Sequence, residues 1–162
     1  MARGDTKFYQ FLLNGFPIIL LFFFALTGYS FSFQIFKINI SFNFIHLIVF
    51  YWVLRKPEML GYGLIFFAGV INDIVLGLLL GTSSLSFLSA ALVATYIRNA
   101  TLRSKIITDW IAFIPAIILS YIVSLYIIVN YSDISFDYII LFRNSFFTFL
   151  FFPIFYIIFI NY

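Results

Sequence analysis

The stretch GVINDIVLGLLLGTSS, from Gly69 to Ser84, decides how this sequence is interpreted. Gly69, Asp73, Gly77 and Gly81 recur at intervals of four, so on one helix they would lie along a single, slowly drifting stripe. Small residues at this spacing let two membrane helices approach closely, and close packing matters there because lipid gives no hydrophobic drive for helices to associate. The stretch therefore predicts a helix-packing face with a carboxylate set into it.

The composition of the whole chain is that of an integral membrane protein. Of its 162 residues, 64% are hydrophobic and 9% are charged, whereas about a quarter of the residues in a typical soluble domain are charged. The net charge of +3 comes from basic residues scattered between apolar runs, which fits membrane topology and argues against nucleic-acid binding. The chain has no cysteine, so no disulfide or thiol site is expected.

Breaks between the apolar runs predict one all-α membrane domain over residues 1–162, a polytopic bundle of about six spans. The first run is interpreted as an uncleaved helix and not a signal peptide, because no residue from Phe8 to Phe36 is charged. The fourth span is short, so a re-entrant hairpin of the third and fourth spans is the alternative to two full crossings. The expected spans are residues 11–32, 38–54, 60–80, 85–97, 110–130 and 138–160.

Lysine and arginine predict the orientation of these spans. With the amino terminus inside, Lys37 lies outside and Arg143 just within the sixth span, and the other basic residues are cytoplasmic. Both termini are therefore expected in the cytoplasm. Thr108 or Asp109 is the expected N-cap of the fifth span. The expected cytoplasmic basic residues, interpreted as topology anchors, are Arg3, Lys7, Arg55, Lys56, Arg98, Arg103 and Lys105.

The fourth span repeats the small-residue spacing at Ser86, Ala90 and Ala94. Two such faces predict a tight antiparallel pair of the third and fourth spans. By contrast, the phenylalanine-rich runs LLFFFAL and SFFTFLFFPIF are expected to face lipid or to interdigitate loosely.

The carboxylate of Asp73 needs a partner, because an aspartate at mid-membrane costs roughly 2.5–3.5 kcal/mol. Arg143 falls at a similar expected depth, which gives the hypothesis of an Asp73–Arg143 pair joining the third and sixth spans. In the alternative, Arg143 reaches outward to lipid phosphates while Asp73 bonds to neighbouring Ser, Asn or backbone groups.

The sequence gives little support for catalysis, and no enzyme activity, cofactor or metal site is expected. His46, the single histidine, is expected to be neutral and hydrogen-bonded in the bundle and not a proton relay. The GTSSL segment from Gly81 is similar to an intramembrane serine-protease loop, but no glycine follows either serine. The sequence also lacks a phosphate-binding glycine loop with lysine, a His/Glu cluster and paired carboxylates.

These motifs together resemble a known family. The pattern G-x-x-x-D-x-x-x-G-x-x-x-G over Gly69–Gly81 follows the segment YWVLRKPE (Tyr51–Glu58) and precedes a small-residue helix. Over about Tyr51–Arg98 the chain resembles MreD, the bacterial rod shape-determining membrane protein family. The first span and the carboxy-terminal third are similar to that family in character only.

The resemblance implies a multi-pass subunit of the cell-elongation machinery in the bacterial cytoplasmic (inner) membrane. It implies partnership with MreC, with the MreB filament and with cell-wall synthases, and a six-helix fold like the substrate-binding subunits of energy-coupling-factor vitamin transporters. The family supplies no catalytic residues. The residues expected to pack helices or face a partner are Gly69, Asp73, Gly77, Gly81, Ser86, Ala90 and Ala94.

The leading expectation is a non-enzymatic scaffold involved in regulating cell shape and peptidoglycan synthesis, whose small-residue face binds the transmembrane helix of MreC. The alternative is a vitamin-binding transporter subunit, which needs an outward-facing pocket with convergent polar groups. The phenylalanine-rich first span counts against that alternative, because it has no alanine repeat at intervals of four.

Overall fold

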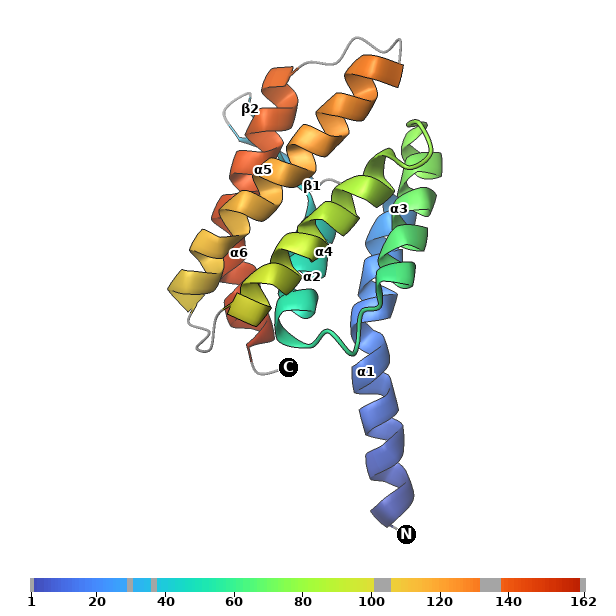
Figure 1. Cartoon of the computed structure of the whole chain (residues 1–162). Helices are drawn as coiled ribbons and strands as arrows, with labels where there is room; N and C mark the ends of the chain where they lie inside the picture. Colours follow the sequence, from blue (N-terminus) through green and yellow to red (C-terminus); the bar gives the residue numbers. More distant parts are fainter. Residues whose placement is uncertain (1, 29–30, 36–37, 101–105, 132–137, 161–162) are drawn as a thin grey trace.

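The computed structural model describes residues 2–28, 31–35, 38–100, 106–131 and 138–160, and it contains six helices in that part of the chain (Figure 1). The prediction of a helical architecture is confirmed. A short antiparallel hairpin of two strands, which the sequence interpretation did not include, lies between the first two helices. The elements are α1 (Ala2–Thr27), β1 (Phe31–Ile35), β2 (Ile38–Phe42), α2 (Phe44–Arg55), α3 (Tyr62–Leu76), α4 (Thr82–Ala100), α5 (Ile106–Tyr131) and α6 (Tyr138–Phe159).

Consecutive helices run in opposite directions, so the described chain begins and ends at the same end of the bundle (Figure 1). We call this the basic end, because Arg55, Lys56 and Arg98 lie at the ends of α2 and α4 there. The opposite end, where α2, α4 and α6 begin, is called the hairpin end. The first turns of α1 extend beyond the other helices at the basic end (Figure 1).

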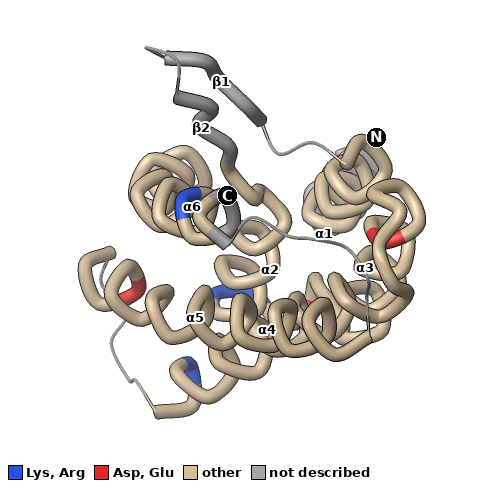
Figure 2. The backbone as a smooth tube through the Cα atoms, turned by 90° about the horizontal axis from the view of Figure 1, so that it is seen from above, with Lys and Arg blue, Asp and Glu red and all other residues tan. Residues whose placement is uncertain are grey.

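Helix α2 is the buried centre of the bundle. Every side chain from Leu47 to Leu54 is buried, and α1, α4, α5 and α6 all contact this helix (Figure 2). The run LIVFYWVL has no polar face, and a helix that is apolar all round is stable only when it is surrounded. At 12 residues α2 is about 18 Å long, much shorter than a ~30 Å hydrocarbon core.

Helix α3 is shorter than expected, and its end breaks the fourfold stripe. Gly77 adopts the left-handed conformation (φ 65°, ψ 29°), and the N–H of Leu78 turns back to donate to the carbonyl of Asp73 over 2.9 Å. This arrangement is a glycine helix stop. Residues 77–80, which were predicted to be helical, therefore lie outside the helix. Gly77 and Gly81 therefore lie outside α3, although their spacing predicted one continuous helix.

The other boundaries differ from the expected spans in both directions. Helix α4 runs for 19 residues from Thr82 to Ala100, so the fourth element is long and the reason for a re-entrant hairpin is removed. The expected second span began at residue 38, but residues 38–42 form β2 and the helix starts at Phe44. Helix α1 ends at Thr27 and not at residue 32, whereas α6 agrees closely with its predicted range.

Two described helices are long and apolar enough to cross a membrane: α5, and residues Phe142–Phe159 of α6. Shorter apolar helices occupy Gly15–Thr27, α2 and α3. The outer faces of the bundle carry many large apolar side chains that are more than half exposed, as at Phe67, Ile118 and Ile157. Such a surface suits a membrane better than water.

The phenylalanine-rich α6 contributes part of the core and part of the outer surface, where its rings were expected to face lipid or to interdigitate loosely. Phe152 and Phe155 are buried, and the Phe152 ring lies 4.8 Å from that of Phe113 and 5.8 Å from that of Phe50. Trp52 packs among the same rings. Because α6 is apolar on all sides, its sequence does not reveal which rings point inward.

Candidate functional site

Asp73 is fully buried and caps the helix that follows its own. One carboxylate oxygen accepts the backbone N–H of Gly81 and the other accepts that of Ser83, each over 2.8 Å. The first N–H groups of a helix have no partner inside the helix, and a carboxylate placed there also suits the helix dipole. Asp73 thus ties the end of α3 to the start of α4.

The hypothesised pair between Asp73 and Arg143 is not formed in the described structure. Both oxygens of Asp73 face the backbone of α4, as in the alternative hypothesis. Arg143 lies on α6, partly buried, and its Nε is buried without a hydrogen-bond partner. Counting residues along the two spans predicted a similar depth for Asp73 and Arg143 in the membrane. It could not predict which face of its helix each side chain occupies.

The predicted close packing of α3 on α4 occurs at Gly69. A methyl group added at Gly69 would lie 2.3 Å from Cα of Ser84 and 2.5 Å from its nitrogen. The two backbones therefore touch at this point, and no side chain fits between them. The Ser84 hydroxyl donates to the carbonyl of Phe66 over 3.0 Å and fastens the same contact.

The small face of α4 is covered by this chain itself. Ser86 is 2% exposed, and Ala90 and Ala94 are completely buried. Helices α2, α3 and α5 all contact α4. The described fold therefore leaves Ala90 and Ala94 no surface to offer a partner helix, contrary to the partner-facing interpretation, and Gly77 acts as a helix stop.

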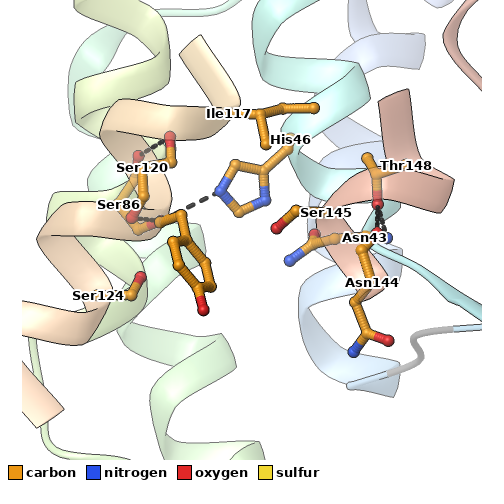
Figure 3. A pocket seen from close by; sticks show the side chains of 10 residues that line it. Asn43, His46, Ser86, Ile117, Ser120, Ser124, Asn144, Ser145 and Thr148 are labelled. Carbon is orange, nitrogen blue, oxygen red and sulfur yellow. Dashed lines mark hydrogen bonds between the residues drawn. The ribbon is translucent and has the colours of Figure 1, made fainter. Parts of the chain in front are cut away.

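A polar cavity with two compartments occupies the hairpin end. The smaller compartment, of about 140 Å³, lies between α2, α4, α5 and α6 (Figure 3). The larger, of about 360 Å³, extends toward the α3–α4 turn and shares five lining residues with the smaller one. We call the two together the polar cavity. The shared residues are Asn43, His46, Ser86, Ser124 and Asn144.

A hydrogen-bond network fixes one wall of the polar cavity. His46 Nε2 lies 3.1 Å from Oγ of Ser86, whose hydroxyl donates to the carbonyl of Ser120 over 3.2 Å (Figure 3). The Ser120 hydroxyl returns a bond to the carbonyl of Ser86 over 3.0 Å. The single proton of the Ser86 hydroxyl has two acceptors within reach, the Ser120 carbonyl and His46 Nε2, so the tautomer of His46 sets the direction of the first bond.

The opposite wall is built by asparagine and threonine. The backbone N–H of Asn43 donates to Oγ1 of Thr148 over 2.9 Å, and that hydroxyl donates to the carbonyl of Asn144 over 2.7 Å. Near the α3–α4 turn, the amide of Asn72 donates to Oγ of Ser83 over 2.9 Å. None of the described residues lining the cavity is Asp, Glu, Lys or Arg, so the cavity suits uncharged hydrogen-bonding groups.

Thr82, which also lines the larger compartment, has a hydroxyl that is closed off from the cavity. The residue is 2% exposed, and its Oγ1 is buried without a hydrogen-bond partner. A buried hydroxyl without a partner costs roughly 1–3 kcal/mol, so this atom is a weak point in the packing at the start of α4.

The sequence did not predict that the residues of this cavity lie together, because they are spread over several apolar segments. Most of them are Asn, Ser or Thr residues in the half of a helix nearest the hairpin end. Polar residues inside membrane segments tend to face the bundle interior, and this signal could have found them. They include Asn43, Asn72, Thr82, Ser120, Ser124, Asn144, Ser145 and Thr148.

The basic end holds an ion pair that the sequence did not predict. Arg55 Nη2 lies 2.8 Å from Oδ2 of Asp109, and the guanidinium stands 5.0 Å from the centre of the Tyr156 ring. Asp109 lies within the first turn of α5 and is not its N-cap, because the helix starts at Ile106. Arg98 donates to the carbonyl of Val53 over 3.0 Å. Two of the expected topology anchors thus also hold helices together.

The comparisons with known proteins give no relative for this arrangement. No family model matches the chain, and no curated protein or solved structure matches it significantly. Among the described residues, no three His, Cys, Asp or Glu side chains gather as a metal site would require.

Proposed function

We propose that the chain is a multi-pass protein of the bacterial cytoplasmic membrane with both ends of the chain in the cytoplasm. The described helices alternate in direction, which supports an even number of passages. The described basic residues at helix ends gather at the end where the chain begins and ends, as the preference of positive charge for the cytoplasm requires. Three further residues used to predict the orientation lie outside the described residues: Lys37, Arg103 and Lys105.

Within that membrane we propose a non-enzymatic scaffold of the cell-elongation machinery, acting with MreC, MreB and the cell-wall synthases as MreD proteins do. The observation that carries this proposal is the structural role of the glycine and aspartate motif on which the resemblance to MreD rests. Gly69 allows backbone contact, Asp73 caps α4, Gly77 stops α3, and Gly81 has φ +100° in the turn. Gly69 and Asp73 on α3 and Gly77 and Gly81 in the turn all serve to join α3 to α4, as expected of a motif that marks a fold and not a catalytic centre.

A partner helix would meet other surfaces than the small face of α4. We place photo-crosslinking residues at Phe23, Phe67 and Ile118, which are 60%, 61% and 51% exposed on α1, α3 and α5. The buried Ala90 serves as the matched control. Adducts with MreC from at least one exposed position, and none from Ala90, are expected. Adducts with lipid alone from all three would contradict the MreC partnership.

Depletion in the organism that makes this protein tests the cellular role. Loss of a scaffold of elongation should turn rod-shaped cells into round ones before growth stops, and synthesis of peptidoglycan along the side wall should fall. Cells that keep their rod shape after the protein has disappeared would refute the role.

One observation favours a second candidate, a vitamin-binding transporter subunit. The polar cavity lies at the end that we place outside, and its larger compartment of about 360 Å³ is within the size range of small-molecule sites. A thermal-shift screen of the purified protein with water-soluble vitamins tests this candidate. One vitamin that clearly raises the melting temperature would support it.

A further inference from the structure

We propose that the polar cavity and an adjoining apolar groove together bind one amphiphilic lipid, with an uncharged, hydroxyl-bearing headgroup in the cavity and its hydrocarbon tail in the groove. This proposal requires that the protein lies in a membrane, but it does not depend on the scaffold role.

The groove runs along the outside of α5 and α6, and we call it the α5–α6 groove. It has a volume of about 440 Å³ and an almost wholly apolar lining that includes Ile114, Phe146 and Phe149. Ile118 and Phe142, which also line it, are 51% and 68% exposed, so the groove opens sideways to the surroundings of the bundle. In a bilayer, hydrocarbon would fill such an opening.

The groove and the polar cavity meet. Ile117, Tyr121 and Ser145 line both the groove and the smaller compartment. In Figure 3, Ile117 and Ser145 lie beside the His46 ring of the smaller compartment. The apolar groove and the chamber of Ser, Asn and His groups therefore adjoin at the three shared residues, between α5 and α6. This division of apolar and polar surface matches a molecule with a tail and a polar head.

The charges around the cavity select the kind of headgroup. A helix N-terminus ordinarily attracts an anion such as phosphate. Here the carboxylate of Asp73 already occupies the N–H groups of Gly81 and Ser83, so the negative charge is supplied by the protein itself. Arg143 is not among the lining residues of either compartment or of the groove. A phosphate is therefore disfavoured, and hydroxyl groups are favoured.

The polar groups that line both compartments support an uncharged, hydroxyl-bearing headgroup. A glycerol or sugar hydroxyl can both donate and accept, so it suits the Ser124 hydroxyl as well as the side-chain amides of Asn43 and Asn144.

Native mass spectrometry of the full chain released from phosphatidylcholine nanodiscs tests the proposal. The discs contain, in separate samples, monooleoylglycerol, oleoyl lysophosphatidylcholine or oleic acid, which share one tail and differ in headgroup. We expect one monooleoylglycerol per chain, retained about tenfold better than the other two. Equal retention of all three would show only general lipid binding and would overturn the proposal.

Two variants locate the site. Ser145→Phe fills the junction between cavity and groove and should abolish retention of monooleoylglycerol, whereas Ile154→Phe, on an exposed face of the same helix, should not. If Ser145→Phe does not fold, Ser124→Ala decides, because it removes one hydroxyl that lines both compartments and leaves the rest of the cavity in place. It should weaken retention about threefold without lowering the melting temperature. Unchanged retention in a folded Ser145→Phe protein, or in Ser124→Ala, contradicts the proposal.

Discussion

The hairpin end and the basic end of the bundle hold their buried polar atoms with side chains of different size. At the hairpin end, small side chains bond to backbone groups: Asp73 caps α4, and Ser86 and Ser120 exchange hydrogen bonds with each other's carbonyls. At the basic end, large side chains close the space, with Arg55 between Asp109 and the Tyr156 ring.

This difference decides where the protein has room for another molecule. Small residues bonded to the backbone leave volume between helices, and both compartments of the polar cavity lie at the hairpin end. Rings such as Phe50, Phe113 and Phe152 interdigitate nearer the basic end and fill the interior. Close aromatic packing and open space are therefore separated along the bundle axis.

The largest expected effect breaks the close contact at the hairpin end. Gly69→Ala places a methyl group against the backbone of Ser84, and backbone cannot move aside as a flexible side chain does. The free energy of unfolding should fall by about 3 kcal/mol, measured by titration with dodecyl sulfate in mixed micelles.

Gly63→Ala is the matched control in the same helix. An added methyl group meets nothing within 4 Å there, so the substitution should be neutral or stabilise the helix by up to about 1 kcal/mol. Equal destabilisation by both alanines would mean that the helix contact at Gly69 is not tight.

Asp73→Asn tests the capping carboxylate and should cost about 2 kcal/mol, because an amide offers one acceptor oxygen where two backbone N–H groups now bond. Arg143→Gln combined with this change should give additive losses, since the two side chains do not pair. The same denaturant titration of the single and double variants measures both. A double variant no worse than either single one would restore the ion-pair hypothesis.

Asp109→Asn tests the corresponding group at the basic end and should cost less, about 1 kcal/mol, because the Arg55 side chain is 30% exposed and water replaces part of the lost attraction. Glu58→Gln, an exposed acid at the same end, is the control and should have no measurable effect. If Asp109→Asn proved more damaging than Asp73→Asn, the contrast between the two ends would be reversed.

The smallest effect is expected on the surface. Tyr62→Phe removes a 2.6 Å hydrogen bond with Thr95, but Tyr62 is 47% exposed, so the unfolding free energy should change by about 0.5 kcal/mol or less. A loss as large as that of Asp73→Asn would show that exposed bonds between α3 and α4 matter as much as buried ones.

Apolar runs separated by charges predicted the helices well, and α6 agreed with its expected range because Arg143 is the only charged residue between positions 138 and 160. The start of α2 was missed although INISF over residues 38–42 alternates apolar and polar residues, the pattern of a strand. Apolar length alone joins this run to the following membrane span, whereas its period of two indicates a strand.

The candidate site shows a different limit of the sequence. Glycines at intervals of four arise from a packing stripe and also from helix ends, and here Gly69 belongs to the first case and Gly77 to the second. The partners of Asp109 and His46 are 54 and 40 residues away, so no local pattern specifies them. The apolar composition predicts that buried polar side chains must have hydrogen-bond partners. Which residues are the partners is known only from the fold.

The burial of α2 has a consequence for how the protein is made. The helix is the second to leave the ribosome, yet its neighbours include α4, α5 and α6, which are synthesised later. Until α6 has been synthesised, the hydrophobic surface of α2 must be covered by lipid or by the insertion machinery. A chain truncated before Tyr138 would leave the centre of the molecule open, so assembly is completed only when translation ends.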